Sequence, residues 1–273
     1  MTAPVADLIR ILDLQKIEEN IFRGQNPTDG ATRVFGGQVL AQALVAAVCT
    51  APPDRVCHSL HAYFLRAGDP AIPILYEVDR SRDGGSFSVR RVVAIQHGAQ
   101  IFVLAASFQK GEDGFAHQAT MPDVPPPEAL TPPDEPMLAA HWRARPFEFR
   151  PVLPRGLADR PARAPLDHVW LRVPAALADQ PVLHQAFLAY ASDMSLLDTA
   201  LLPHGKGLFS NVQVASLDHA MWFHRPFRCD DWMLYSQESP AAFGARGFSR
   251  GMIFARDGTL IASVAQEGLI RAR

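Results

Sequence analysis

The two halves of this chain carry some of the same residues in the same order. When the 273-residue sequence is shifted by 159 positions, matches appear at several separate points. They are Phe64-Leu65-Arg66 with Phe223-His224-Arg225, Leu75-Tyr76 with Leu234-Tyr235, and Gly85 with Gly244. After one inserted residue, Gly98 meets Gly258, Ile101 meets Ile261 and Ala105 meets Ala265. Because these matches keep one register over about forty residues, they indicate an internal duplication.

Each half has a pattern of one helix followed by four strands. The first half predicts a helix over 37–49, then, after Pro52-Pro53, strands over 57–66, 72–80, 86–96 and 100–109. The second half predicts a helix over 182–202, ended by Pro203, and strands over 212–224, 232–239, 245–256 and 259–271. A short amphipathic helix is expected within residues 1–15.

A proline-rich stretch separates the halves. Residues 121–136 contain seven prolines, which fix φ and remove backbone donors, so this stretch is expected to be a linker. We expect it to continue as an irregular crossing segment to about Arg163. The organisation predicted is an N-terminal unit over 1–120, a linker over 121–163 and a C-terminal unit over 164–273. The fold class is α+β, with each helix covered by a curved antiparallel sheet.

Composition limits the setting and the partners. A net charge of −2 gives no basic excess for nucleic acid, and no apolar run reaches the roughly 18 residues that would span a membrane. The cysteines, Cys49, Cys57 and Cys229, are too few and too scattered for a disulfide framework or a zinc site. We therefore expect a soluble protein of the reducing cytoplasm, with no metal.

Several longer motifs resemble one known family. They are Phe22-Arg23-Gly24, 34–38 (VFGGQ), 58–66 (HSLHAYFLR), 83–91, 190–193 (YASD), 217–227 (LDHAMWFHRPF), 245–248 (ARGF) and Gln266-Glu267-Gly268. Together they resemble the bacterial acyl-CoA thioesterase II family, whose eukaryotic relatives are peroxisomal acyl-CoA thioesterases. The resemblance covers nearly the whole chain. It implies the double hotdog fold, which agrees with the repeat.

The resemblance also implies three catalytic residues: an Asp on the second-half helix, a Thr or Ser before an Asp-His pair, and a Gln in the last strand. Here these are Asp193, Ser216 and Gln266. Ser216 departs from the Thr of many bacterial members, although either hydroxyl can donate and accept a hydrogen bond. From the residues alone, a Ser or a Gln on a strand is better explained by a structural role than by a catalytic one. Asp193, set in an apolar helix pattern, is expensive to bury unless it is hydrogen-bonded, which suits either a structural or a functional role.

The start of the first helix is a candidate oxyanion site. Gly37 and Gln38 follow Gly36 there, and the first turn of a helix has unpaired backbone N–H groups. A glycine turn that feeds a helix is an equally good interpretation. In the first half Ala106 stands where the second half has Gln266, so we expect only one of the two halves to have kept the polar group.

Other chemistry-bearing patterns have structural interpretations. Asp218-His219 and His224 could suggest a metal site or a base, but side chains five apart on a strand point to opposite faces. The same holds for His58 and His61. Residues 247–251 (GFSRG) match the G-x-S-x-G pattern of serine hydrolases, yet Ser249 lies inside a predicted strand with no helix after it.

The function expected from the resemblance is hydrolysis of medium- to long-chain fatty acyl-CoA by a water that Asp193, Ser216 and Gln266 orient, with no cofactor. We expect a homodimer or larger homo-oligomer, because sheet edges often pair between subunits. The alternatives are an acyl-CoA-binding protein of the same fold without turnover, an enoyl-CoA hydratase of the same fold, and an esterase that uses Ser249 as nucleophile.

Overall fold

The computed structural model describes residues 2–28, 30–132, 136–154, 158–207 and 210–273. In these residues one antiparallel sheet of thirteen strands runs through both halves of the chain. Its order is β1-β2-β4-β5-β6-β3-β10-β13-β12-β11-β8-β7, with β9 paired to β13. The strands are β1 (Gln15–Glu18), β2 (Ile21–Gly24), β3 (Arg55–Phe64), β4 (Ile74–Asp83), β5 (Phe87–Gln96), β6 (Ala99–Lys110), β7 (Glu148–Pro151), β8 (Leu166–Arg172), β9 (Val212–Ser216), β10 (Asp218–Phe223), β11 (Met233–Phe243), β12 (Arg246–Ala255) and β13 (Leu260–Ala272).

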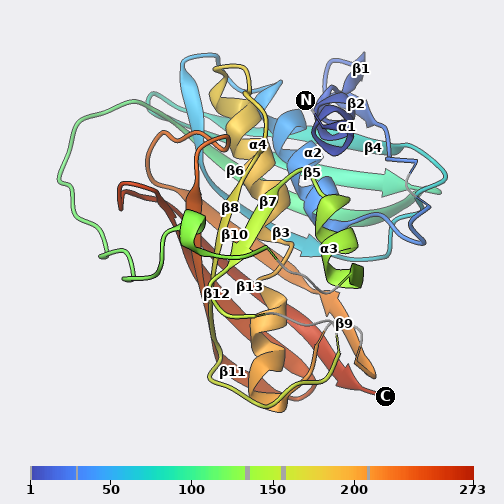
Figure 1. The fold of residues 1–273 in the computed structure, drawn as a ribbon. Coiled ribbons are helices and arrows are strands. Elements are labelled where there is room, and N and C mark those ends of the chain that lie inside the picture. The colour runs from blue at the N-terminus through green and yellow to red at the C-terminus, as the bar shows by residue number, and fades with distance from the viewer. Residues whose placement is uncertain (1, 29, 133–135, 155–157, 208–209) are drawn as a thin grey trace.

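Two central helices lie side by side against the sheet (Figure 1). They are α2 (Gly36–Val48) and α4 (Pro181–Ser192). Both are rich in alanine and have no charged residue, so almost every turn can be buried and the two helices can approach closely. The shorter elements are α1 (Ala3–Leu12), α3 (Pro136–Arg143) and two 3₁₀ segments, η1 (Pro127–Ala129) and η2 (Leu197–His204).

The two halves join where β3 pairs with β10. These strands run antiparallel, with Leu60 opposite Met221 and both side chains buried in the core. Each half therefore contributes one helix and its strands to a shared apolar core on the helix side of the sheet. This arrangement brings the ends of α2 and α4 together, which matters for the site.

Most of the predicted elements form within a few residues of the expected bounds, including the amphipathic α1. One helix prediction was wrong: the segment expected as a single helix over 182–202 divides into α4 and η2, and Pro203 lies inside η2. The division lets η2 lie close on the sheet, because a Cβ on Gly247 would come 2.6 Å from Ala200 and a Cβ on Gly268 would come 2.2 Å from Leu197. The strand expected over 212–224 also divides, into β9 and β10.

The segment between the halves is more ordered than its prolines suggested. Residues 121–132 contain only η1, in keeping with a linker, but α3 and β7 form in the part that was expected to be irregular. The sequence patterns also missed β1, β2 and β8, which are the short strands towards the two edges of the sheet. The domain limits 1–120, 121–163 and 164–273 stay a prediction.

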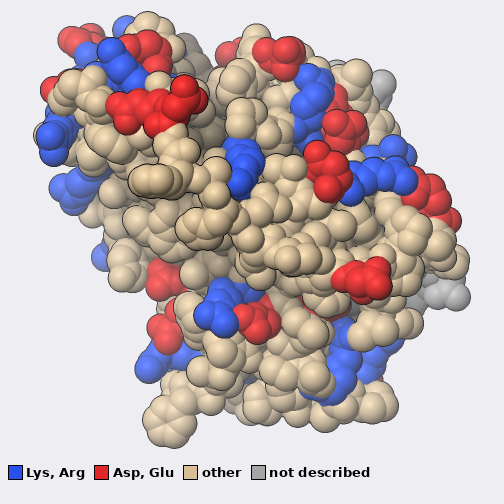
Figure 2. Space-filling model, turned by 90° about the vertical axis from the view of Figure 1, so that its left-hand side faces the viewer, with Lys and Arg blue, Asp and Glu red and all other residues tan. Residues whose placement is uncertain are grey.

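Charge and hydropathy on the folded chain match the composition. On the face shown in Figure 2, basic and acidic side chains are interspersed and neither sign forms a continuous patch. In the part of the chain that the structure describes, no helix is both long enough and apolar enough to cross a membrane.

Candidate active site

Asp193, Ser216 and Gln266 meet in space although they are far apart in the sequence. Gln266 Nε2 lies 2.6 Å from Asp193 Oδ1 and 2.8 Å from Ser216 Oγ. Ser216 Oγ lies 3.1 Å from the same Asp193 oxygen. Asp193 caps the C-terminal end of α4, Ser216 is the last residue of β9, and Gln266 projects from the middle of β13.

The donors and acceptors of this group can be assigned from its chemistry. An ionised carboxylate only accepts, so the Gln266 amide must present its nitrogen and use both hydrogens, one towards Asp193 and one towards Ser216. Ser216 in turn donates its hydroxyl hydrogen to Asp193. Gln266 is fully buried, whereas Asp193 and Ser216 are only partly buried. The Gln266 amide is therefore more deeply buried than the two residues that it contacts.

Two glycines at the start of α2 let that helix lie against the site. A Cβ on Gly36 would come 2.6 Å from Asp193 Oδ2, and a Cβ on Gly37 would come 2.4 Å from the carbonyl oxygen of Tyr190. Any larger residue at either position would push the two helices apart. The first turn of α2, whose N-cap Phe35 makes no side-chain capping bond, is thereby held beside Asp193.

The electrostatics of Asp193 suit a base that works near neutral pH. Burial raises the pKa of Asp193 to about 6, while hydrogen bonds from Gln266, Ser216 and the Gly37 backbone oppose that rise. A carboxylate of this pKa is mostly ionised at pH 7 and is more basic than an ordinary one, which is what proton abstraction from water requires.

A charged residue near the site that the sequence did not reveal is Arg145. Its guanidinium lies 5.0 Å from the centre of the Phe35 ring, and that ring packs edge-on against Tyr190 at 4.9 Å. The positive charge of Arg145 also lowers the pKa of Asp193, although it is the smallest of the causes that act on this carboxyl. Arg145 follows α3 in the connecting segment, and one arginine among many in a chain with 26 basic residues carries no sequence signal.

Gln38 does not point at the other candidates. Its Nε2 lies 2.8 Å from Asn26 Oδ1 and also faces the Gln25 carbonyl and Gln42. Its backbone N–H donates to the Phe35 carbonyl at 3.1 Å. The side chain therefore ties α2 to the loop before it, and Gly37 is the candidate whose N–H faces the site.

The histidine motifs serve hydrogen bonds within the fold. His219 is fully buried with Nε2 2.8 Å from Ser192 Oγ, whereas His224 bonds Ser263 on the other face. His58 bonds Ser107, and His61 packs edge-on against Trp222. Over the described residues, no group of three or more His, Cys, Asp or Glu could hold a metal ion.

The G-x-S-x-G match is explained by packing. Ser249 lies inside β12 and is fully buried, so it stands in no strand-turn-helix elbow. Gly247 makes room for Ala200, and a Cβ on Gly251 would come 2.4 Å from the Tyr235 ring. The two glycines are therefore sites of close approach, and the pattern between them arises by coincidence.

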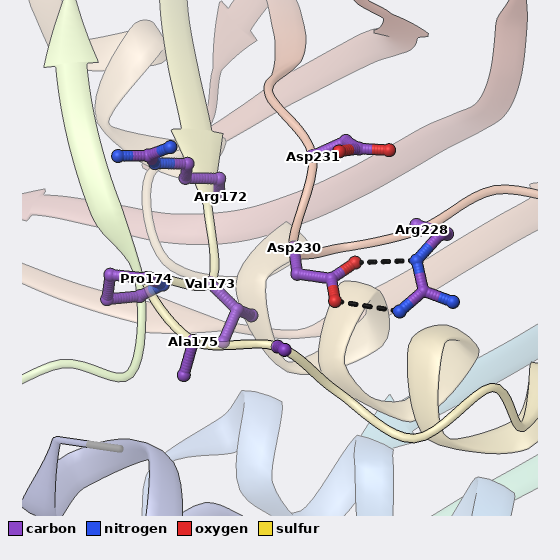
Figure 3. A pocket seen from close by; sticks show the side chains of 8 residues that line it. Arg172, Val173, Pro174, Ala175, Arg228, Asp230 and Asp231 are labelled. Carbon is purple, nitrogen blue, oxygen red and sulfur yellow. Dashed lines mark hydrogen bonds and ion pairs between the residues drawn. The ribbon is translucent and has the colours of Figure 1, made fainter.

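A hollow of about 380 Å³ lies elsewhere, between β8 and the loop that precedes β11 (Figure 3). Both arginines that line it are paired: Arg228 lies 2.8 Å from Asp230 and 3.0 Å from Asp179, and Arg172 lies 2.8 Å from Glu148. None of the residues that line it belongs to the group around Asp193.

Comparison with known proteins gives matches along nearly the whole chain. Residues 25–109 match the family model described as the acyl-CoA thioesterase N-terminal domain, and residues 158–269 match the model described as acyl-CoA thioesterase. Acyl-CoA thioesterase 2 of Haemophilus influenzae is 44% identical over 97% of both chains. Acyl-coenzyme A thioesterase 8 of Homo sapiens is 43% identical over 96% of this chain and 88% of its own length.

Solved structures are also similar to this chain. The crystal structure of an acyl-CoA thioesterase II from Mycobacterium marinum is 45% identical, with a TM-score of 0.85 over 97% of this chain and 98% of the other. A protein from Alicyclobacillus acidocaldarius described as having a hot dog fold superposes with a TM-score of 0.78 at 20% identity, which speaks for the fold alone. The predicted double hotdog is confirmed.

Proposed function

The chain belongs to the acyl-CoA thioesterase II family and is an acyl-CoA hydrolase, and we propose that it releases CoA from medium- to long-chain fatty acyl-CoA through a water oriented by Asp193, Ser216 and Gln266. The observation that supports this mechanism is that Ser216 and Gln266 both donate to one carboxylate oxygen of Asp193, and that Gln266 also donates to Ser216. Three separate elements supply them, and the pKa of the carboxyl is raised to about 6.

In the first step Asp193 takes a proton from water while the water oxygen attacks the thioester carbonyl carbon. Gln266 and Ser216 hold the carboxylate, so that its remaining lone pairs face the partly exposed side where water enters. The negative charge then moves to the former carbonyl oxygen. The first turn of α2 begins beside Asp193, and the Gly36 N–H is the candidate donor to that oxygen, because the Gly37 N–H already bonds the carboxylate.

In the second step the tetrahedral intermediate collapses and the carbon–sulfur bond breaks. A thiol has a pKa of roughly 8.5, so CoA can leave as a thiolate with little acid assistance. Asp193 returns its proton to solvent or to the thiolate. Atoms and charge balance as one thioester and one water giving one acid and one thiol, so the reaction needs no metal or cofactor. Association into a homodimer or larger assembly stays a prediction, which sedimentation would test.

The other candidates find less support. A binding protein without turnover would have no need of a hydrogen-bonded carboxylate with a raised pKa at a solvent-accessible point. A hydratase would need the Asp-His pair at the site, but His219 points into the core and its burial lowers its pKa to about 3. A Ser249 nucleophile is unreachable because Ser249 is fully buried.

The test is CoA release from a series of saturated acyl-CoA substrates by the wild type and by Asp193→Asn. We expect the kcat of the variant to fall at least about a hundredfold, as for loss of a general base. Because burial raises the pKa of Asp193, its ionised form destabilises the folded state above pH 6. The uncharged Asn variant should therefore have a Tm at pH 8 at least equal to that of the wild type, so a lower rate would not be caused by unfolding. Wild-type turnover in the variant would reject the mechanism, and a maximum at short acyl chains would reject the chain-length proposal.

A further inference from the structure

Three polar side chains lie in a row behind the carboxylate, across β10, β13 and β12. Ser249 pairs directly with Gln266 between β12 and β13. Ala220 pairs with Ala265 between the antiparallel strands β10 and β13. The next pair in this register is His219 with Gln266, so these two residues lie side by side. All three side chains are fully buried, on the side of the sheet that carries α4.

Each of the three has one polar atom without a hydrogen-bond partner among the described residues: His219 Nδ1, Gln266 Oε1 and Ser249 Oγ. A buried polar atom without a partner is costly, and three on neighbouring strands are unusual in a folded core. Their side chains belong to adjacent positions, so one ligand can satisfy more than one of them.

The neighbouring bonds decide which of these atoms accept. Ser192 Oγ donates its one hydrogen to the Ala189 carbonyl at 2.8 Å, so it must accept from His219 Nε2. The proton of the neutral imidazole is therefore on Nε2, and His219 Nδ1 is an acceptor. Gln266 Oε1 is also an acceptor, because the amide nitrogen faces Asp193. Ser249 supplies a hydroxyl that can donate.

We propose that a buried water, bound by Ser249, His219 and Gln266, holds the Gln266 amide with its nitrogen towards Asp193, which makes Ser249 and His219 positioning residues for the reaction. The water donates one hydrogen to Gln266 Oε1 and one to His219 Nδ1, and it accepts the hydroxyl hydrogen of Ser249. This satisfies all three atoms and gives the water three partners, the usual number for a buried water. The inference rests on the role proposed for Gln266.

The water also explains why the Gln266 amide keeps this orientation and does not flip. A flipped Gln266 would place its oxygen against the carboxylate oxygen of Asp193 and its nitrogen towards His219 Nδ1. With the water in place, the flip would also remove a hydrogen bond that the water donates. The first half has no such arrangement, because Arg90 stands opposite Ala106 at the equivalent strand pair and its side chain fills the space.

The kinetic test is a double-mutant cycle between Ser249 and Gln266. We expect Ser249→Ala to lower kcat about tenfold, the effect of one lost buried hydrogen bond, with KM within about twofold. In the Gln266→Ala background the same change should alter kcat less than about twofold, because the group it positions is gone. Ser88→Ala is the matched control, since Ser88 is a fully buried serine on β5, and its kcat should equal that of the wild type.

The outcomes separate this inference from the proposed mechanism. If Gln266→Ala alone keeps wild-type kcat, the mechanism itself fails. If Gln266→Ala is impaired but Ser249→Ala is not, or if Ser249→Ala costs the same in both backgrounds, only the positioning role fails. A crystal structure at roughly 1.5 Å tests the ligand directly: an ordered water within hydrogen-bond distance of Gln266 Oε1 is expected, and an empty position there would overturn it.

Discussion

The two halves place different side chains at the same point of the same strand pair. In the first half Arg90 on β5 stands opposite Ala106 on β6, and in the second half Ser249 on β12 stands opposite Gln266 on β13. In the first half a long side chain on β5 lies beside a small one on β6, and in the second half the small side chain is on β12 and the long one is on β13. The two pairs therefore fill a similar space. The difference shows that a duplicated scaffold can keep its packing while only one copy keeps a polar amide at this position.

In both halves the long side chain reaches the C-terminal end of the central helix. Arg90 bonds the Thr50 carbonyl at 2.9 Å, just past the end of α2, and pairs with Asp83 at 2.8 Å. A cation is favourable there because the C-terminal end of a helix is partly negative. The end of α4 instead carries the carboxylate of Asp193, which that end of a helix disfavours. The first arrangement stabilises the fold, and the second keeps a carboxylate basic.

The largest effect is expected when Gln266 is replaced by the residue of the first half. Gln266→Ala removes both hydrogen bonds that the amide donates, and kcat should fall about a hundredfold, as when one preorganised donor is lost. The measurement is kcat and KM for CoA release. The reciprocal change, Ala106→Gln, should add no activity because Cys49 and Thr50, which follow α2, provide no carboxylate. A gain of turnover there would break the distinction between the halves.

Arg90→Met tests the opposite expectation, a loss of stability without a loss of rate. The variant leaves the Thr50 carbonyl without its charged donor, and we expect the free energy of unfolding to fall by about 2 kcal/mol. Denaturant unfolding measures the loss, with kcat of the folded enzyme as the second readout. Arg91→Met, the exposed neighbour, is the matched control and should change neither. A large drop in kcat for folded Arg90→Met would mean that Arg90 contributes to the site and not only to stability.

The repeat made the fold predictable, because a helix followed by a meander, found twice in one register, leaves few arrangements. The short strands β1, β2, β7 and β8 were missed since four to seven residues near a sheet edge carry little periodicity. The long second helix was also predicted wrongly. Its apolar pattern continues through η2, and only the close approach allowed by Gly247 and Gly268 shows where the helix stops.

The site was predicted from a family resemblance and could not have been assembled from spacing. Asp193, Ser216 and Gln266 are separated by 23 and 50 positions, and only the folded sheet brings them together. The resemblance still gave no reason for Gly36, which the structure explains by its contact with Asp193 Oδ2. It also gave no sign of Arg145 or Ser249, whose roles depend on neighbours that lie far away in the sequence.

The pH dependence of kcat/KM should show one ionisation on the acid side. Since burial raises the pKa of Asp193 to about 6 in the free enzyme and the base must be ionised, kcat/KM should fall as the pH drops through 6, about tenfold per unit below it. Loss of thioester absorbance is a suitable measurement because it does not depend on thiol ionisation. In Gln266→Ala, which lacks a bond that lowers this pKa, the residual activity should fall at a higher pH. If the acid limb of the wild-type profile has its midpoint near pH 4, Asp193 is not the base.

The smallest effect is expected at Arg145, whose positive charge lowers the pKa of Asp193 at the end of α4. Arg145→Met removes a cation that lowers the pKa of Asp193, so the acid limb of kcat/KM should move to higher pH. A partly exposed charge is worth about 0.2–1 kcal/mol, which corresponds to a kcat/KM lower by roughly 1.2-fold to threefold at pH 6 and to little change at pH 9. Arg145→Lys keeps the charge and should retain the wild-type limb. If both variants lose activity equally at every pH, Arg145 acts through its contact with Phe35, since a lysine cannot reproduce the planar stacking of a guanidinium.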